Sequence, residues 1–152
     1  MPKFSTDRRV AHSVDDMFAL VADIEAYPQF VPLCEKLAVR GTSSEGGREV
    51  LVADMTVGYK AIRETFTTRV VLDRAQSTIL ADYLDGPFRH LNSVWTFRPD
   101  GADACIVGFA IDYEFRSRLL SALMGSVFDR AFRKFSSAFE ARADRVYGAS
   151  PA

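Results

Sequence analysis

The stretch from Ser117 to Tyr147 carries the longest regular pattern of hydrophobic positions in the chain. Its apolar residues recur three or four positions apart, which is the spacing of one face of an α-helix. They are Leu120, Met124, Val127, Phe128, Ala131, Phe135, Ala138 and Phe139. The opposite side carries Asp129, Arg133, Ser136 and Glu140. Ser117 can cap the first turn and Gly148 can end the helix. We therefore predict an amphipathic helix of roughly 45 Å, which needs a large concave surface to cover its apolar face.

Alternation of apolar and polar residues predicts seven β-strands before this helix. The first is Lys3–Ala11, and the last is Cys105–Phe115, in which every second residue is apolar. Turn residues separate five more strands, which are Leu33–Thr42, Arg48–Val57, Tyr59–Leu72, Thr78–Leu84 and Phe88–Arg98. Gly58 is expected to form a bulge or a bend. Because short turns join most of the successive strands, we expect neighbouring strands to pair antiparallel.

Two short helical segments are predicted after the first strand. Ser13 precedes the first of them and can cap it, and its helical spacing ends near Asp23. The second is one turn within Ile24–Pro32, since the two prolines of this segment prevent a longer element. The order of elements indicates an α+β fold in which one curved antiparallel sheet wraps around the C-terminal helix.

Composition and charge narrow the classes of function. The 152 residues are 48% hydrophobic, which fits a single domain over 1–152, with an ordered core at about 3–147. The formal charge of −1 provides no field for a polyanion, so we expect no DNA partner. No apolar run approaches the roughly 18 residues of a membrane span. We expect a cytoplasmic protein that is at most peripheral to the inner membrane.

Residues that carry enzyme chemistry are few. Cys34 and Cys105 lie far apart without a CxxC motif and are predicted to be buried thiols. His12 is predicted to be exposed or to act as a cap, and His90 to lie at the surface, with a hydrogen bond to a ligand carbonyl as the alternative. The chain lacks the HExxH, GxSxG, Walker and GxGxxG motifs. We therefore expect no catalytic residue, no metal site and no cofactor.

Three stretches of the chain carry a family resemblance. They are Val21–Cys34 (VADIEAYPQFVPLC), Gly86–Phe97 (GPFRHLNSVWTF), and Phe115–Ser117 (FRS) together with Ala138–Arg142 (AFEAR). With the order of elements, they resemble the coenzyme Q-binding proteins of the START-like, polyketide cyclase-like superfamily. They also resemble the bacterial relatives that are labelled ribosome-association toxins. The resemblance implies a helix-grip fold and a hydrophobic tunnel between sheet and long helix that takes the isoprenoid tail of a quinone.

The candidate ligand-binding residues are mostly large apolar side chains that point toward the long helix or border the tunnel. They are Tyr27, Phe30, Val31, Pro32, Met55, Val57, Phe66, Phe88, Leu91, Trp95, Phe109, Tyr113, Met124, Phe128 and Phe135. Plain core packing is the alternative for each of them. A helix this long is hard to pack solidly inside a curved sheet, so we expect an apolar cavity. Its mouth is predicted to join Tyr27–Cys34 to Gly86–Leu91, with Phe30 and Phe88 able to swing.

Three functions follow from these observations. The resemblance implies a non-catalytic protein that holds ubiquinone or a similar isoprenoid lipid and supports its delivery in respiration or quinone biosynthesis. The bacterial relatives imply instead a ribosome-associating protein that interferes with translation, which the near-neutral charge disfavours. The third function is a cyclase-type enzyme on the same fold, which the lack of a placed acid and base disfavours.

Two basic clusters on the long helix bear on the choice of partner. Arg130, Arg133 and Lys134 lie on its polar face and would serve a ribosomal partner. At its start, arginines adjoin leucines in a basic and apolar corner of Arg116, Arg118, Leu119 and Leu120. We interpret this corner either as a solvated helix terminus or as a contact with an anionic bilayer surface.

Overall fold

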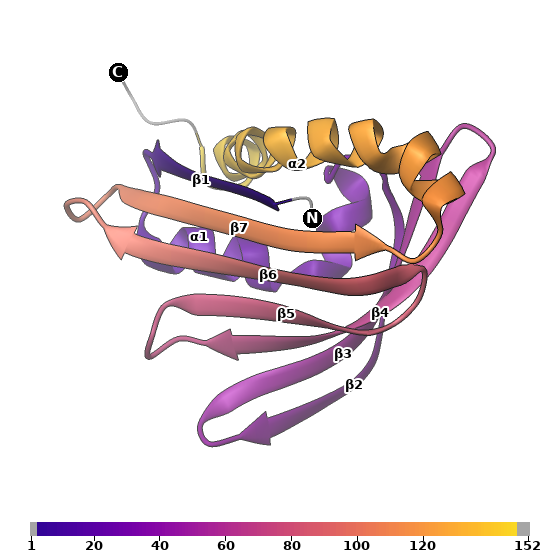
Figure 1. The fold of residues 1–152 in the computed structure, drawn as a ribbon. Coiled ribbons are helices and arrows are strands. Elements are labelled where there is room, and N and C mark those ends of the chain that lie inside the picture. The colour runs from indigo at the N-terminus through magenta and orange to yellow at the C-terminus, as the bar shows by residue number, and fades with distance from the viewer. Residues whose placement is uncertain (1–2, 149–152) are drawn as a thin grey trace.

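The predicted α+β helix-grip architecture is present in the computed structural model, which describes residues 3–148 (Figure 1). A seven-stranded antiparallel sheet has the strand order β1-β7-β6-β5-β4-β3-β2. The strands are β1 (Lys3–Val10), β2 (Cys34–Glu45), β3 (Arg48–Tyr59), β4 (Ile62–Asp73), β5 (Thr78–Asp85), β6 (Phe88–Pro99) and β7 (Cys105–Phe115). The helices are α1 (Val14–Ala22), the short 3₁₀ helix η1 (Ile24–Gln29) and α2 (Arg118–Tyr147).

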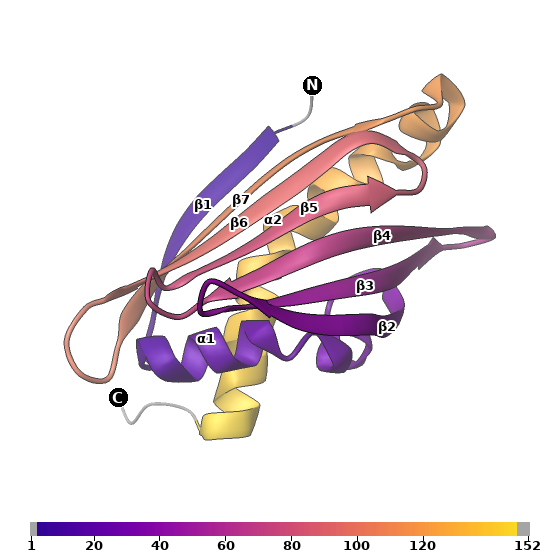
Figure 2. The same ribbon diagram turned by 90° about the horizontal axis from the view of Figure 1, so that it is seen from below.

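The sheet curves around α2, which crosses its concave face (Figures 1 and 2). β1 pairs with β7, so the first and last strands lie side by side at one edge, with Val10 opposite Cys105. The chain then turns through α1 and η1 and adds the strands from the far edge inward. Figure 2 shows α1 lying across the C-terminal half of α2. The two short helices therefore cover one end of the concave face, as the order of elements requires.

Local sequence explains where both α-helices begin. The hydroxyl oxygen of Ser13 accepts a hydrogen bond from the backbone N–H of Asp16 at 3.1 Å, and that of Ser117 accepts one from Leu120 at 3.1 Å. Gly148 follows the last turn of α2 with a positive φ of 89°. These caps confirm the helix boundaries predicted from the hydrophobic spacing.

Several strand ends differ from the prediction by one to three residues. Tyr59, expected to open the fourth strand, is the last residue of β3, and β4 begins at Ile62. Leu33, expected to open the second strand, has a positive φ of 69° and lies in the connection before β2. Its carbonyl oxygen accepts a hydrogen bond from Gly58 N at 3.0 Å. Gly58 is therefore a regular residue of β3 and forms neither a bulge nor a bend. A Cβ at this position would displace the carboxylate of Glu35, which lies at the end of a flexible side chain.

Burial in the core settles the predictions for the cysteines and for His12. Cys34 and Cys105 are buried, as predicted, and burial raises the pKa of each thiol to about 11. The prediction that His12 is exposed or capping is wrong, because the residue is only 5% exposed. Its Nε2 lies 2.7 Å from Oδ1 of Asp144 near the end of α2. Ser136, placed on the polar face of the helix from its spacing, is also buried.

Candidate functional site

An apolar cavity of about 110 Å³ lies between the concave face of the sheet and α2. Its wall draws on η1, on the link from η1 to β2, on every strand from β2 to β7 and on the middle of α2. Most of the predicted ligand-binding residues form part of this wall. They are Tyr27, Val31, Pro32, Met55, Val57, Phe66, Leu91, Trp95, Phe109, Phe128 and Phe135.

The hollow exists because small side chains face inward at the centre of the sheet. Ala53 on β3 is opposite Thr68 on β4, and Ala81 on β5 is opposite Ser93 on β6. All four residues line the cavity, and Ala131 lines it from α2. Larger side chains at these positions would fill the space beneath the helix. The predicted ligand-binding residues included none of the five, although small residues at inward positions of neighbouring strands were the available signal.

Several larger lining residues were also absent from the list of predicted ligand-binding residues. They are Ile24, Leu33, Leu37, Val70, Ile79, Ile111, Phe132 and Phe139. Their apolar character is common to the whole core, so sequence pattern alone does not separate the wall of a cavity from solid packing.

Aromatic rings build the side of the cavity where the sheet meets α2. The Trp95 ring lies 4.5 Å from that of Phe109 and 4.8 Å from that of Phe139, measured between centroids. Phe109 in turn contacts Phe135 at 5.6 Å. Such tilted and edge-to-face contacts add to the stabilisation from burial, so they strengthen the packing of this side of the wall.

Four of the predicted residues lie outside the cavity wall, and they are Phe30, Phe88, Tyr113 and Met124. The predicted swinging of Phe88 is wrong, because its side chain is 0% exposed. Five aromatic rings surround it with centroids at 4.8 to 6.2 Å, and these belong to Phe66, Tyr83, Tyr113, Phe115 and Phe128.

The turn before Phe88 is locked by close packing. Gly86 has a positive φ of 140°, and a Cβ there would lie 2.6 Å from the Cβ of Phe66. The backbone N–H of Phe88 donates to the Tyr83 hydroxyl at 3.1 Å. The segment Gly86–Leu91 is therefore packed against its neighbours. The prediction that it forms half of a mobile mouth is wrong.

The other half of the predicted mouth borders the cavity. Val31, Pro32 and Leu33 line it, and Pro32 and Leu33 are partly exposed to solvent. This link between η1 and β2 therefore lies between the cavity and solvent. It has no regular hydrogen-bond ladder of its own, and Leu33 adopts the left-handed conformation that costs a non-glycine residue about 1 kcal/mol.

Phe30 belongs to a cluster that holds η1 against the end of α2. Its ring contacts those of Tyr27 at 6.0 Å and Phe139 at 5.0 Å. The guanidinium of Arg142 lies over the same ring at 5.1 Å and donates to the side-chain oxygen of Gln29 at 2.7 Å. Phe30 thus fixes the position of Tyr27, which does line the cavity.

The polar groups of the wall are few and neutral. Thr68 and Ser93 contribute hydroxyls, and Trp95 contributes an indole N–H. The hydroxyl of Tyr27 already donates to the backbone oxygen of Val21, and burial raises the pKa of this phenol well above its usual range. The wall can therefore desolvate an apolar group and offer a small number of hydrogen bonds to a polar end.

The predicted surface position of His90 agrees with the structure, where it lies outside the cavity wall. Its Nε2 is 2.9 Å from Oδ1 of Asp112 on β7, and this hydrogen bond holds the pKa of Asp112 below its usual range. Within residues 3–148, no cluster of His, Cys, Asp and Glu side chains has the geometry to hold a metal ion. None of the helices in that part of the chain combines the length and apolar character needed to cross a bilayer.

Known proteins resemble this chain in sequence and in fold. The sequence profile of the family described as polyketide cyclase / dehydrase and lipid transport matches residues 10–140. The chain is 38% identical over 149 residues to the ribosome association toxin RatA of Escherichia coli strain K12, covering 98% of this chain and 91% of the relative.

Two further matches connect the chain to a mitochondrial protein and to a solved structure. Identity to the coenzyme Q-binding protein COQ10 homolog B of Xenopus laevis is 30% over 150 residues, covering 96% of this chain and 59% of that protein. The 18 kDa protein CC1736 from Caulobacter crescentus, known from a solution structure, is 37% identical with a TM-score of 0.79. That match covers 98% of this chain and 100% of the other. All of these similarities include the elements that form the cavity.

Proposed function

The chain belongs to the polyketide cyclase, dehydrase and lipid transport family, and from this premise we propose that it binds a lipid without catalysing a reaction. The ligand we propose is ubiquinone or a similar isoprenoid lipid, held between the sheet and α2 and delivered for respiration or quinone biosynthesis. The observation that carries the proposal is the cavity wall, which consists of aliphatic, aromatic and neutral polar side chains. A wall of this kind favours apolar groups over charged ones.

The size of the cavity limits what it holds. An engineered apolar cavity of about 150 Å³ binds benzene, so about 110 Å³ suits one ring or one isoprenoid unit. A longer tail would leave through the side bounded by Pro32 and Leu33. Burial of one five-carbon isoprenoid unit contributes about 4 kcal/mol before ordering costs, so retention of the lipid needs further contacts along the part that leaves the cavity.

Filling the hollow tests this function directly. Ala81→Leu places a larger apolar side chain at the centre of the wall, and we expect it to abolish uptake of decylubiquinone while the protein stays folded. Ala110→Leu on β7 is the matched control, because Ala110 is exposed and does not belong to the wall. Native mass spectrometry and organic extraction of protein from a quinone-producing host measure the bound lipid. Absence of any lipid, together with no uptake by the parent protein, would contradict the proposal.

Ribosome association is the second candidate function, and the similarity to the Escherichia coli toxin favours it. The predicted basic cluster is weaker than its sequence indicates. Arg133 forms an ion pair with Asp129 at 2.9 Å and its guanidinium lies over the Phe4 ring at 4.9 Å, which leaves Arg130 and Lys134 exposed. Co-sedimentation with ribosomal subunits, compared between the parent and an Arg130→Glu/Lys134→Glu variant, tests this function.

A cyclase-type enzyme is the remaining alternative, and the family description includes cyclases. Acid and base catalysis needs a titratable pair within reach of the substrate. The described cavity wall provides hydroxyls and an indole for this purpose and contains neither a carboxylate nor an imidazole. The geometry therefore favours binding.

A further inference from the structure

The first two turns of α2 expose apolar and basic side chains together. Leu119 is 70% exposed and Leu123 is 53% exposed, and their spacing places them one helical turn apart on the same side. Arg116 and Arg118 are exposed beside them. We call these four residues the leucine-arginine corner. Leu120, expected from sequence to belong to it, packs instead against the hydrophobic core.

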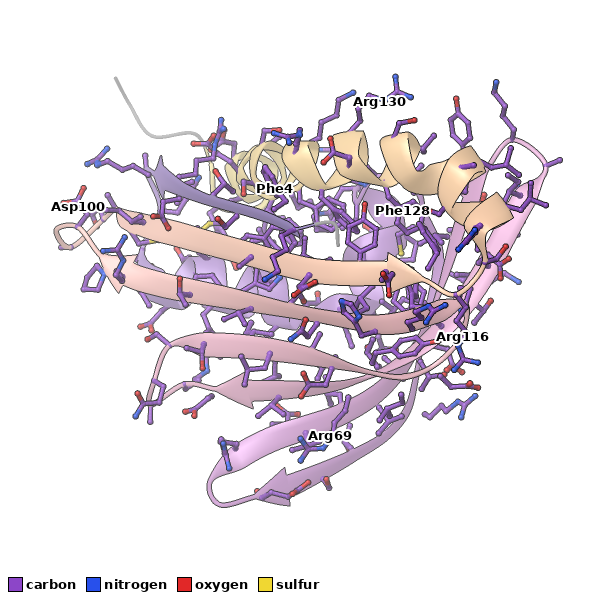
Figure 3. All side chains as sticks on the ribbon, viewed as in Figure 1. Phe4, Arg69, Asp100, Arg116, Phe128 and Arg130 are labelled. Carbon is purple, nitrogen blue, oxygen red and sulfur yellow. The ribbon has the colours of Figure 1, made fainter. Side chains whose placement is uncertain are left out.

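The corner lies at one end of the molecule. In Figures 1 and 2, the start of α2 extends past the end of β7, and Figure 3 shows Arg116 at this end. Nε of Arg116 donates to the backbone oxygen of Phe88 at 2.9 Å, which anchors the segment between β7 and α2 to the sheet. The leucines therefore project from a fixed position.

Neither the exposed leucines nor the arginines at the helix start stabilise the isolated chain. Exposed leucines leave apolar surface in water. Arginines at a helix N-terminus lie at the positive end of the helix dipole, where acidic residues are favoured, and the first turn of α2 has none. Between Glu114 and Asp129 the sequence contains no acidic residue at all. A partner that is both anionic and apolar would make both properties favourable.

We infer that the leucine-arginine corner docks the protein on an anionic lipid bilayer, with Leu119 and Leu123 entering the acyl boundary and the arginines contacting headgroup phosphates. This combination of an apolar face and flanking basic residues is how amphipathic helices bind membrane interfaces. The inference deepens the proposed function, because it identifies the surface on which an apolar ligand is collected or released.

Two other occupants fit the corner less well. A second copy of this chain related by two-fold symmetry would place Arg116 and Arg118 near the same arginines of its partner, with no acidic residue of the corner to neutralise them. RNA would pair with the arginines but would leave the leucines without apolar contact. A bilayer satisfies both kinds of side chain.

The corner and part of the cavity wall lie on the same helix. Phe128 follows Leu123 by five residues on α2, and it lines the cavity together with Ala131 and Phe132. Figure 3 shows Phe128 on the side of α2 that faces the sheet and Arg130 on the side that faces away. Docking through the first turns would therefore hold the helix that roofs the cavity at the membrane surface.

Vesicle flotation tests the inference. With vesicles of phosphatidylcholine and phosphatidylglycerol at low salt, we expect the parent protein to float, and to float much less with phosphatidylcholine alone or at high salt. Leu119→Ser/Leu123→Ser should weaken binding about tenfold or more, and Arg118→Gln several-fold. Val146→Ser, at the other end of α2, removes a side chain that is 51% exposed and should leave flotation unchanged.

Each outcome decides for or against the corner. The inference is overturned if the parent protein does not float with the anionic vesicles. It is also overturned if the double-leucine variant floats as well as the parent. Loss of ribosomal-subunit binding in that variant, with no vesicle binding by the parent, assigns the corner to a ribosomal partner instead. Decylubiquinone uptake is measured separately without vesicles, so failure of the proposed function is distinguishable. Flotation without uptake leaves the docking surface standing and removes the quinone ligand.

Discussion

Trp95 on β6 packs edge-to-face against Phe139 on α2, with 4.8 Å between their ring centroids and 64° between their planes. Both residues line the cavity, and their contact ties the sheet to the long helix at its wall. Trp95 is also the single tryptophan of the chain. The same side chain is therefore part of the core, part of the candidate site and a spectroscopic probe of both.

Removing this contact should destabilise the fold. Trp95→Ala deletes a buried indole and enlarges an existing cavity, so we expect a loss of about 3–5 kcal/mol in the free energy of unfolding. Trp95→Phe retains an aromatic ring and should lose less. Urea denaturation followed by circular dichroism measures both variants. A loss below about 1 kcal/mol for Trp95→Ala would mean that the indole does not join the sheet to α2.

Ligand binding should change the fluorescence of Trp95. A quinone ring in the cavity would lie in contact with the indole, and we expect decylubiquinone to quench the emission saturably. Decanol, which has a chain of the same length without the quinone, should compete with decylubiquinone while quenching little itself. The Ala81→Leu variant, in which the hollow is filled, should show no saturable quenching. Quenching that is linear and unaffected by this substitution would indicate collision in solution.

Phe88 should behave as a core residue. Because its ring is fully buried among five others, Phe88→Ala is expected to cost about 3–5 kcal/mol and Phe88→Asp to prevent folding. Phe88→Leu retains apolar volume and should lose less. Thermal unfolding compares the three proteins. If Phe88→Asp had the melting temperature of the parent, the result would support the mobile gate that was predicted from the sequence.

Two glycine substitutions should have opposite effects on stability. Gly86→Ala forces a Cβ to within 2.6 Å of the Phe66 Cβ at a φ of 140°, so we expect a loss of more than about 2 kcal/mol. Gly125 lies inside α2, and an added Cβ there would meet no atom within 4 Å, so Gly125→Ala should gain about 0.5–1 kcal/mol. The urea midpoints of the two variants, each compared with that of the parent, measure both effects. Equal midpoints would contradict the tight turn before Phe88.

Alkaline pH should destabilise the protein through its buried thiols. The pKa of Cys34 and of Cys105 rises from an ordinary 9.0 to about 11, because burial penalises the thiolate. Below pH 9 both states keep the thiols protonated, and the contribution to stability is fully present. Between pH 9 and 11 only the unfolded state releases the protons, so stability falls as pH rises. The urea midpoint should drop over this window, and less so in Cys105→Ala. A flat profile would contradict the burial of the thiols.

Periodicity along the chain was enough to predict the elements and their order. Apolar spacing located α2, and the hydroxyls of Ser13 and Ser117 located the helix starts, because capping and helix periodicity act between residues a few positions apart. Short turns required antiparallel neighbours, so the pairing of successive strands from β2 to β7 followed without knowledge of any long-range contact.

The tertiary structure alone decided which residues meet. The pairing of β1 with β7 and the length of α2 bring His12 and Asp144 together. The two residues are 132 positions apart, so no local sequence pattern predicts their contact. Whether Phe88 moves or is locked depends on how closely Gly86 approaches Phe66 across the sheet.

The position of the cavity also depends on register. Ala53 lies opposite Thr68, and Ala81 lies opposite Ser93, so the small side chains gather beneath the helix. A shift of one residue in either pairing would turn a small side chain toward solvent and bring a larger one inward, filling the hollow. The sequence by itself determined that the sheet and the long helix each have an apolar face that must be covered. The long-range pairing of the strands determined where these two faces leave a cavity between them.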